Sequence, residues 1–142
     1  MRFVFHDGGR AAAGYRGSTA DCVTRAIAIA TGKPYQEVYD ALNRLAEMER
    51  RSKRRRRRSS SRTGVYRATY QRYLQALGWR WTPTMRIGSG CQVHLRASEL
   101  PQGALLVKVS THLTAVIDDV IHDTHDCSRT GTRCVYGYFS MG

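Results

Sequence analysis

The first half of the chain carries apolar residues at helical spacing. They recur every three or four positions across residues 23–30, and Gly32 supplies a stop because glycine tolerates the left-handed conformation that ends a helix. A second helix is expected over about 34–48, where Pro34 suits the first turn. A third is expected over about 65–77. The pattern therefore predicts three helices before residue 78.

The second half changes to the period of β-strands. Residues 79–84 alternate apolar and polar side chains, and further short apolar runs follow. Asp118-Asp119 separates two such runs and predicts a tight two-residue hairpin. Strands are expected at 2–5, 79–84, 91–95, 104–110, 112–117, 120–124 and 134–139. Helices followed by antiparallel strands predict one α+β domain over residues 1–142.

Positive charge is concentrated in one segment. The formal net charge is +12, and residues 50–62 hold nine Lys or Arg and no acidic residue. Without them, 14 basic residues face 11 acidic ones, so the rest of the chain is only mildly basic. Like charges and serines bury little apolar area. We therefore predict a disordered Arg-rich loop over residues 50–63, within the domain.

Several function classes are disfavoured by the composition. The sequence has no run of about 18 apolar residues, so it predicts no membrane span. The N-terminal residues lack the apolar run of a secretory signal. A cytoplasmic protein is expected. Its cysteines, Cys22, Cys91, Cys127 and Cys134, are then expected to be reduced thiols. The alternative is a disulfide between Cys127 and Cys134, which flank a glycine-containing loop.

Cys22 lies at the predicted start of the first helix. The free N–H groups and partial positive charge of a helix N-terminus favour a thiolate, which is the reactive form of cysteine. The same N–H groups can stabilise an oxyanion. The alternative interpretation is a small buried apolar side chain. Position alone leaves both interpretations open.

His112 begins the strand that leads into the predicted hairpin. If Ile117 pairs with Val120 across the turn, the alternation of side chains places a set of residues on one face, namely His112, Thr114, Val116, Ile121, Asp123 and His125. Asp123 is then the diagonal neighbour of His112. A carboxylate there would orient the imidazole and stabilise its charged form. A slip of one residue in the register would move it away.

A cysteine on a leading helix followed by a histidine and an acid on adjacent strands is the order found in thiol hydrolases. Asp21-Cys22, the apolar helix behind it and the segment HLTAVIDDVIHD resemble the papain-like cysteine peptidase superfamily. The similarity is to compact bacterial members, such as cell-wall endopeptidases and double-glycine leader peptidases, and to uncharacterised bacterial and phage proteins. It covers the first helix and the last forty residues.

The resemblance implies a papain-like fold with N-terminal helices followed by an antiparallel sheet. It also implies Cys22 as nucleophile, His112 as general base and acid, and Asp123 as orienter. The expected reaction is acyl transfer to Cys22 and hydrolysis of a peptide or isopeptide bond in a peptide or protein substrate, with no metal or organic cofactor. A catalytically silent interaction domain would share this frame.

One position departs from the papain-like pattern. These enzymes often carry a glutamine about six residues before the cysteine, where it completes the oxyanion hole, and this chain has Arg16 there. The Arg16 side chain, Ser18 or Thr19 would have to take its place, together with the backbone N–H of Cys22.

Two other constellations lead to different functions. Cys91 and His94 form a C-x-x-H pair, but zinc needs four ligands, and residues three apart on a strand face opposite sides. Packing or capping roles are therefore favoured over a metal site. Arginines of the loop, Arg54, Arg55, Arg56, Arg57 and Arg58, would bind nucleic-acid phosphates or substrate. The alternative function is thus a nucleic-acid-binding accessory protein; the alternative role for the run is a solvated linker.

Overall fold

The computed structural model describes residues 1–50 and 57–141 and has a mixed α+β fold. Its helices are α1 (Cys22–Thr31), α2 (Tyr35–Ala46) and α3 (Arg67–Ala76). Its strands are β1 (Arg2–Phe5), β2 (Trp79–Pro83), β3 (Ala104–Val109), β4 (His112–Ile117), β5 (Val120–Asp123) and β6 (Gly137–Met141). The α+β prediction is confirmed. In the described ranges, no helix has the length and apolar character needed to cross a bilayer.

The strands form one six-stranded sheet in the order β1-β5-β4-β3-β6-β2. All pairings among β5, β4, β3, β6 and β2 are antiparallel. Strand β1 instead runs parallel to β5, with Phe3 opposite Ile121. The prediction of an antiparallel sheet is therefore wrong at this edge, and the sheet is mixed. The short strand RFVF is exposed along its length, so its pattern holds no information about which strand it joins or in which direction.

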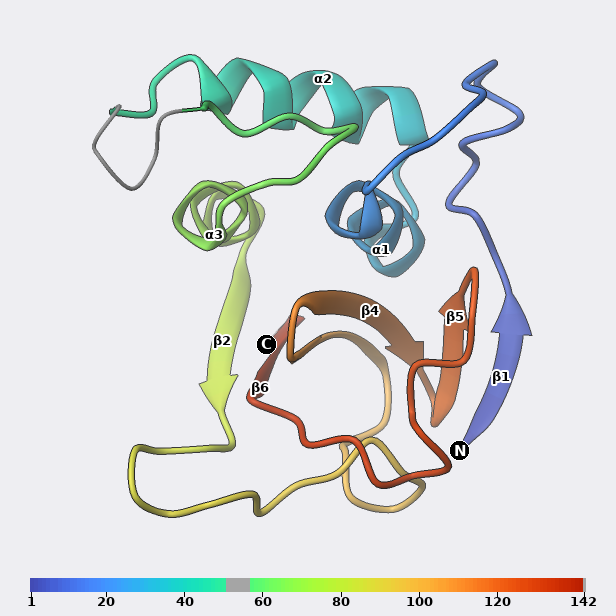
Figure 1. The fold of residues 1–142 in the computed structure, drawn as a ribbon, viewed down its shortest axis with the longest axis vertical. Coiled ribbons are helices and arrows are strands. Elements are labelled where there is room, and N and C mark those ends of the chain that lie inside the picture. Colours follow the sequence, from blue (N-terminus) through green and yellow to red (C-terminus); the bar gives the residue numbers. More distant parts are fainter. Residues whose placement is uncertain (51–56, 142) are drawn as a thin grey trace.

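The helices lie on one side of the curved sheet (Figure 1). Helix α1 packs directly on β4, and its Ile27 is fully buried. One apolar cluster fills the space between helices and sheet, with Leu106 and Leu113 from the strands. A second cluster, including Val107 and Val116, lies on the other face. The first cluster thus holds α1 against β4, and the second covers the opposite face of the sheet.

The segment 91–95 differs from the prediction of a strand. Its regular pairing is limited to a single bridge between His94 and Cys134. The last strand begins at Gly137 instead of residue 134, because residues 134–135 pair with this irregular segment: the Val135 N–H donates to the carbonyl of Val93 at 2.8 Å. A disulfide between Cys91 and Cys134 joins the two stretches.

The last part of the Arg-rich segment is packed, in contrast to the predicted disordered loop over 50–63. Ser59 and Ser61 are buried, with 6% and 1% of their surface exposed. The Ser61 hydroxyl donates to the carbonyl of Tyr39 at 2.6 Å, and the Ser61 carbonyl accepts from the hydroxyl of Thr24. Serine hydrogen bonds with α1 and α2 fix residues 59–61, which composition alone could not reveal. Residues 51–56 lie outside the described part.

Candidate functional site

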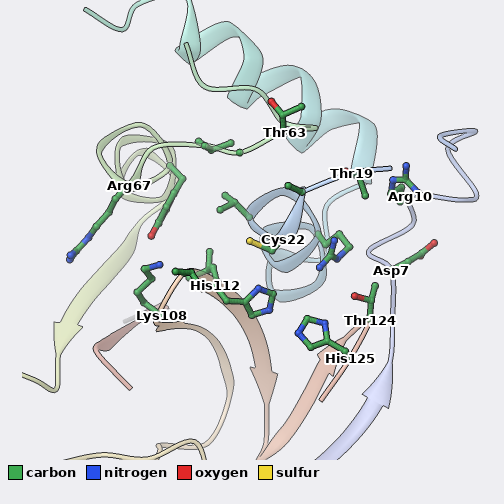
Figure 2. A pocket seen from close by; sticks show the side chains of 18 of the residues that line it. Asp7, Arg10, Thr19, Cys22, Thr63, Arg67, Lys108, His112, Thr124 and His125 are labelled. Atoms are coloured by element: carbon green, nitrogen blue, oxygen red, sulfur yellow. The ribbon is translucent and has the colours of Figure 1, made fainter. Parts of the chain in front are cut away.

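A cavity of about 840 Å³ opens at the N-terminus of α1 (Figure 2). Its wall comes from β1, α1, α3, β3, β4 and the loops before α1, before α3 and after β5. Cys22 and His112 both line it, although 90 positions separate them in the sequence. The structure therefore brings the predicted nucleophile and the predicted base to one surface that a ligand can reach.

The β4–β5 hairpin places His112 beside Asp123. Asp118 and Asp119 form the two-residue turn, with φ angles of 49° and 64°, and Ile117 lies opposite Val120 as predicted. The register confirms the predicted shared face. His112 Nε2 lies 2.7 Å from Asp123 Oδ2. Since Nε2 is engaged by this carboxylate, Nδ1 is the ring nitrogen left for the sulfur of Cys22.

Asp123 is held by several donors besides the imidazole. The hydroxyl of Thr114 donates to its Oδ2 at 2.7 Å, and the backbone N–H of Thr124 donates to its Oδ1 at 2.7 Å. Arg25, from the first turn of α1, reaches the same Oδ1 at 3.3 Å. The carboxylate is only 4% exposed, so these contacts replace its hydration. They fix the orientation of the carboxylate, and through it that of the His112 ring.

Asp21 immediately precedes Cys22 and is the N-cap residue of α1. Its side chain is buried, and it pairs with Arg25 and accepts a hydrogen bond of 2.6 Å from the hydroxyl of Tyr35. Arg10 contributes a further contact at 3.7 Å. These positive partners neutralise the charge next to Cys22. Arg25 thus connects two carboxylates, Asp21 below the helix terminus and Asp123 on the hairpin.

The electrostatics of the site favour an ion pair between Cys22 and His112. Burial raises the pKa of the Cys22 thiol, but the hydrogen bond with His112 and a contact with the backbone of Leu113 outweigh it, so the net pKa is lowered. Burial lowers the pKa of His112, while hydrogen bonds with Asp123, Cys127 and Cys22 raise it well above its ordinary value. Burial opposes ionisation of Asp123, yet His112 and Thr114 lower its pKa to about 2.

The proposed oxyanion residues are not gathered at the sulfur. Arg16 and Ser18 are exposed and do not line the cavity. Thr19 lines it, but its hydroxyl donates to the carbonyl of Arg62 at 2.9 Å. Across the described residues, the backbone N–H groups of Cys22 and Val23 have no hydrogen-bond acceptor. These two groups at the α1 N-terminus are the oxyanion donors that the geometry leaves available.

Sequence reasoning missed several cavity residues, among them Arg25, Lys108 and Tyr70. Lys108 lies on the side of β3 that faces the helices, two residues after the fully buried Leu106. A lysine at a core-facing position of a central strand was the signal that could have found it. Burial lowers its pKa, and the charge of Cys22 opposes that shift. Tyr70 from α3 also lines the cavity, and burial raises its pKa to about 12, which keeps the hydroxyl neutral.

Cys127 is a second free thiol near the imidazole. It is 3% exposed, and its sulfur, a ring nitrogen of His112 and a carboxylate oxygen of Asp123 all lie within 4.8 Å of one another. Histidine, aspartate and cysteine are ligand types that zinc accepts. The guanidinium of Arg25 on the same carboxylate disfavours a cation there. The contacts of Asp123 therefore suit an ion pair better than a metal centre.

The other cysteines differ from both sequence predictions. Cys91 and Cys134 form a disulfide with a Cα–Cα distance of 5.8 Å, whereas Cys127 is free. The prediction of reduced thiols at Cys91 and Cys134 and the alternative of a Cys127–Cys134 disulfide were therefore wrong. Disulfide pairing depends on tertiary proximity, which the spacing of cysteines in the sequence does not reveal. Cys91 is unavailable as a metal ligand. The His94 ring contacts Glu99 at 3.3 Å.

Of the predicted phosphate-binding arginines, Arg57 and Arg58 are exposed and do not line the cavity. Arg54, Arg55 and Arg56 lie outside the described residues. Comparison of the chain with family models, with curated proteins and with solved structures gave no match. The arrangement of side chains at the cavity is therefore the basis for a functional assignment.

Proposed function

We propose that this chain is a papain-like cysteine hydrolase that cleaves a peptide, isopeptide or related amide bond. The observation that carries the proposal is the sequence of contacts from Cys22 to His112 to Asp123 along one wall of an open cavity. The lowered pKa of the Cys22 thiol and the raised pKa of His112 support a thiolate–imidazolium pair. Such a pair is the activated form of a cysteine nucleophile.

The reaction has two steps. In the first, the Cys22 sulfur attacks the carbonyl carbon, a C–S bond forms, and the C–N bond breaks as His112 donates its proton to the leaving amine. In the second, His112 accepts a proton from water, the resulting hydroxide attacks the thioester, and the carboxylic acid leaves as the Cys22 thiolate reforms. The sum is amide plus water giving acid plus amine.

Each remaining group has a role that follows from its position. The N–H groups of Cys22 and Val23 are available for the negative oxygen of the tetrahedral intermediate. Asp123 keeps the imidazole oriented and stabilises its charge through the 2.7 Å contact. Arg25 acts as a positioning residue, because it binds Asp123 and the carboxylate next to the nucleophile.

The test is the rate of alkylation by iodoacetamide as a function of pH, with the adduct located by mass spectrometry. We expect Cys22 to be the residue labelled under native conditions, well below the ordinary thiol pKa of about 8.5. Cys127 is buried, and the other two cysteines are in the disulfide, so they serve as internal controls. His112→Ala should move the labelling to alkaline pH.

Activity is then measured on a mixture of fluorogenic peptides, where Cys22→Ala should remove hydrolysis. Slow labelling of Cys22 with an ordinary thiol pH profile would contradict the proposal. Rapid labelling without any hydrolysis would indicate a silent interaction domain. Deletion of residues 51–56 should leave the labelling unchanged, because Arg50 and Arg57, the described residues on either side of the deletion, do not line the cavity.

A further inference from the structure

The cavity beside Cys22 contains more positive charge than its own acidic groups neutralise. The arginine and lysine side chains that line it are Arg10, Arg25, Arg67 and Lys108, and the carboxylate that lines it is that of Asp7. Arg10 and Arg25 pair with the buried Asp21 and Asp123. Asp7 accepts from the backbone N–H groups of Gly9 and Ala11 at 2.9 and 3.0 Å. Its carboxylate is therefore already used by the loop that carries it.

Lys108 and Arg67 have no carboxylate within 4.0 Å in the described part of the chain. Lys108 is partly buried on the helix-facing side of β3. Arg67 begins α3 and lines the cavity, and its guanidinium lies over the ring of Trp81, 4.3 Å from the ring centre. Figure 2 shows both side chains on the same side of Cys22.

The environment of Lys108 contains further positive charge. Burial and the charges of Arg67 and Arg133 lower its pKa, and the charge of Cys22 is what opposes them. Arg133 itself donates to the carbonyl of Ser110, a neutral group. A partly buried cation such as Lys108, with like charges nearby and no counter-ion, costs free energy in the folded state. An anionic ligand placed between Lys108 and Arg67 would relieve this repulsion.

We propose that Lys108 and Arg67 bind a carboxylate of the substrate next to the scissile bond. The proposal rests on the proposed hydrolase function and names its substrate class: peptides with an acidic side chain or a free C-terminal carboxylate near the bond that Cys22 attacks. The two cations differ in geometry. Arg67 presents a planar fork suited to both carboxylate oxygens, while Lys108 presents a compact charge closer to the strand.

The experiment compares two reagents that alkylate the same thiolate, neutral iodoacetamide and anionic iodoacetate. The ratio of their rates at Cys22 reports local positive charge and is independent of the thiolate fraction, which affects both equally. Lys108→Gln and Arg67→Gln should each lower the iodoacetate-to-iodoacetamide ratio by roughly three- to tenfold at low salt. Arg67 is exposed, so its variant is expected to fold even where Lys108→Gln is impaired.

Lys33→Gln is the matched control, because it removes the same charge from a lysine that pairs with Glu37 and lines a different cavity. It should leave the ratio unchanged. An unchanged ratio in both cavity variants would overturn the carboxylate site while leaving fast iodoacetamide labelling, and hence the hydrolase, intact. Slow iodoacetamide labelling of the unmodified chain would instead count against the hydrolase itself.

A second arm identifies the source of the carboxylate. Peptides with Glu in place of Gln, and peptides with a free acid in place of a C-terminal amide, are compared by kcat/KM. A preference for either anionic form that disappears in Arg67→Gln supports the proposal and names the source. Equal kcat/KM for all forms overturns the proposal. Stronger protection of Cys22 against alkylation by oligothymidylate than by an acidic peptide also overturns it.

Discussion

Replacing Asp123 with asparagine separates the electrostatic role of this residue from its shape. The asparagine keeps the volume and one carbonyl oxygen for the Thr114 hydroxyl, but removes the charge that His112 Nε2 meets at 2.7 Å. A hydrogen bond to a charged group contributes about 1.5–3 kcal/mol. At about 1.4 kcal/mol per pKa unit, the pKa of His112 should fall by roughly one to two units. The thiolate–imidazolium pair would then persist over a narrower pH range.

The same substitution should change stability in a pH-dependent way. Asp123 has its pKa lowered from 3.8 to about 2 in the folded chain, which corresponds to about 2 kcal/mol at neutral pH for a side chain this buried. Because the folded pKa is depressed, this contribution is present above pH 3.8 and is lost as the pH falls through about 2. The stability difference between the unmodified chain and Asp123→Asn should therefore shrink on acidification.

Two measurements check this reasoning. The ring-proton NMR signals of His112 report its titration, and urea unfolding at several pH values reports stability. The control is Asp40→Asn, an exposed aspartate whose contact is a hydrogen bond with Gln36 at 2.9 Å. An unchanged His112 titration in Asp123→Asn would refute the electrostatic role. A stability loss of the same size at pH 7 and near pH 2 would show that shape, not charge, is what Asp123 supplies.

Two further perturbations test how the fold supports the site. Reduction of the Cys91–Cys134 disulfide, which closes a separation of 43 residues, should lower stability by about 4 kcal/mol, measured by thermal unfolding, yet leave the pH profile of iodoacetamide labelling unchanged. Gly8→Ala should destabilise the fold more than Gly14→Ala does, by about 1–3 kcal/mol, and should also slow the labelling of Cys22. Both glycines have positive φ. A Cβ at Gly8 would lie 2.9 Å from the Cα of Arg25, whereas one at Gly14 would meet nothing within 4 Å. Equal effects of the two substitutions would contradict the close approach of this loop to α1.

The parts of the site that local rules determine were predictable. Turn chemistry at Asp118-Asp119 sets the hairpin register, and the register places Asp123 beside His112. The start of α1 at Cys22 follows from the spacing of apolar residues behind it. Each of these inferences uses contacts between residues that are close in sequence.

The remainder depends on tertiary contacts between distant segments. The parallel pairing of β1 with β5 and the Cys91–Cys134 bridge both join stretches that no local pattern relates. Lys108 was overlooked because the run ALLVKV reads as a strand, and the side of the sheet that its fifth residue faces depends on where the helices pack. Arg25 was overlooked because it lies within an apolar helix.

The distance in sequence between the two halves of the site sets an order of events during synthesis. Asp123 follows Cys22 by about a hundred residues, so at typical translation rates of 5–20 residues per second it emerges roughly 5–20 s later. Throughout that interval the sulfur has neither its imidazole nor the hairpin that holds it. Under the proposed function, a nascent chain therefore carries an ordinary thiol, and the thiolate–imidazolium pair forms only after the C-terminal half has been made.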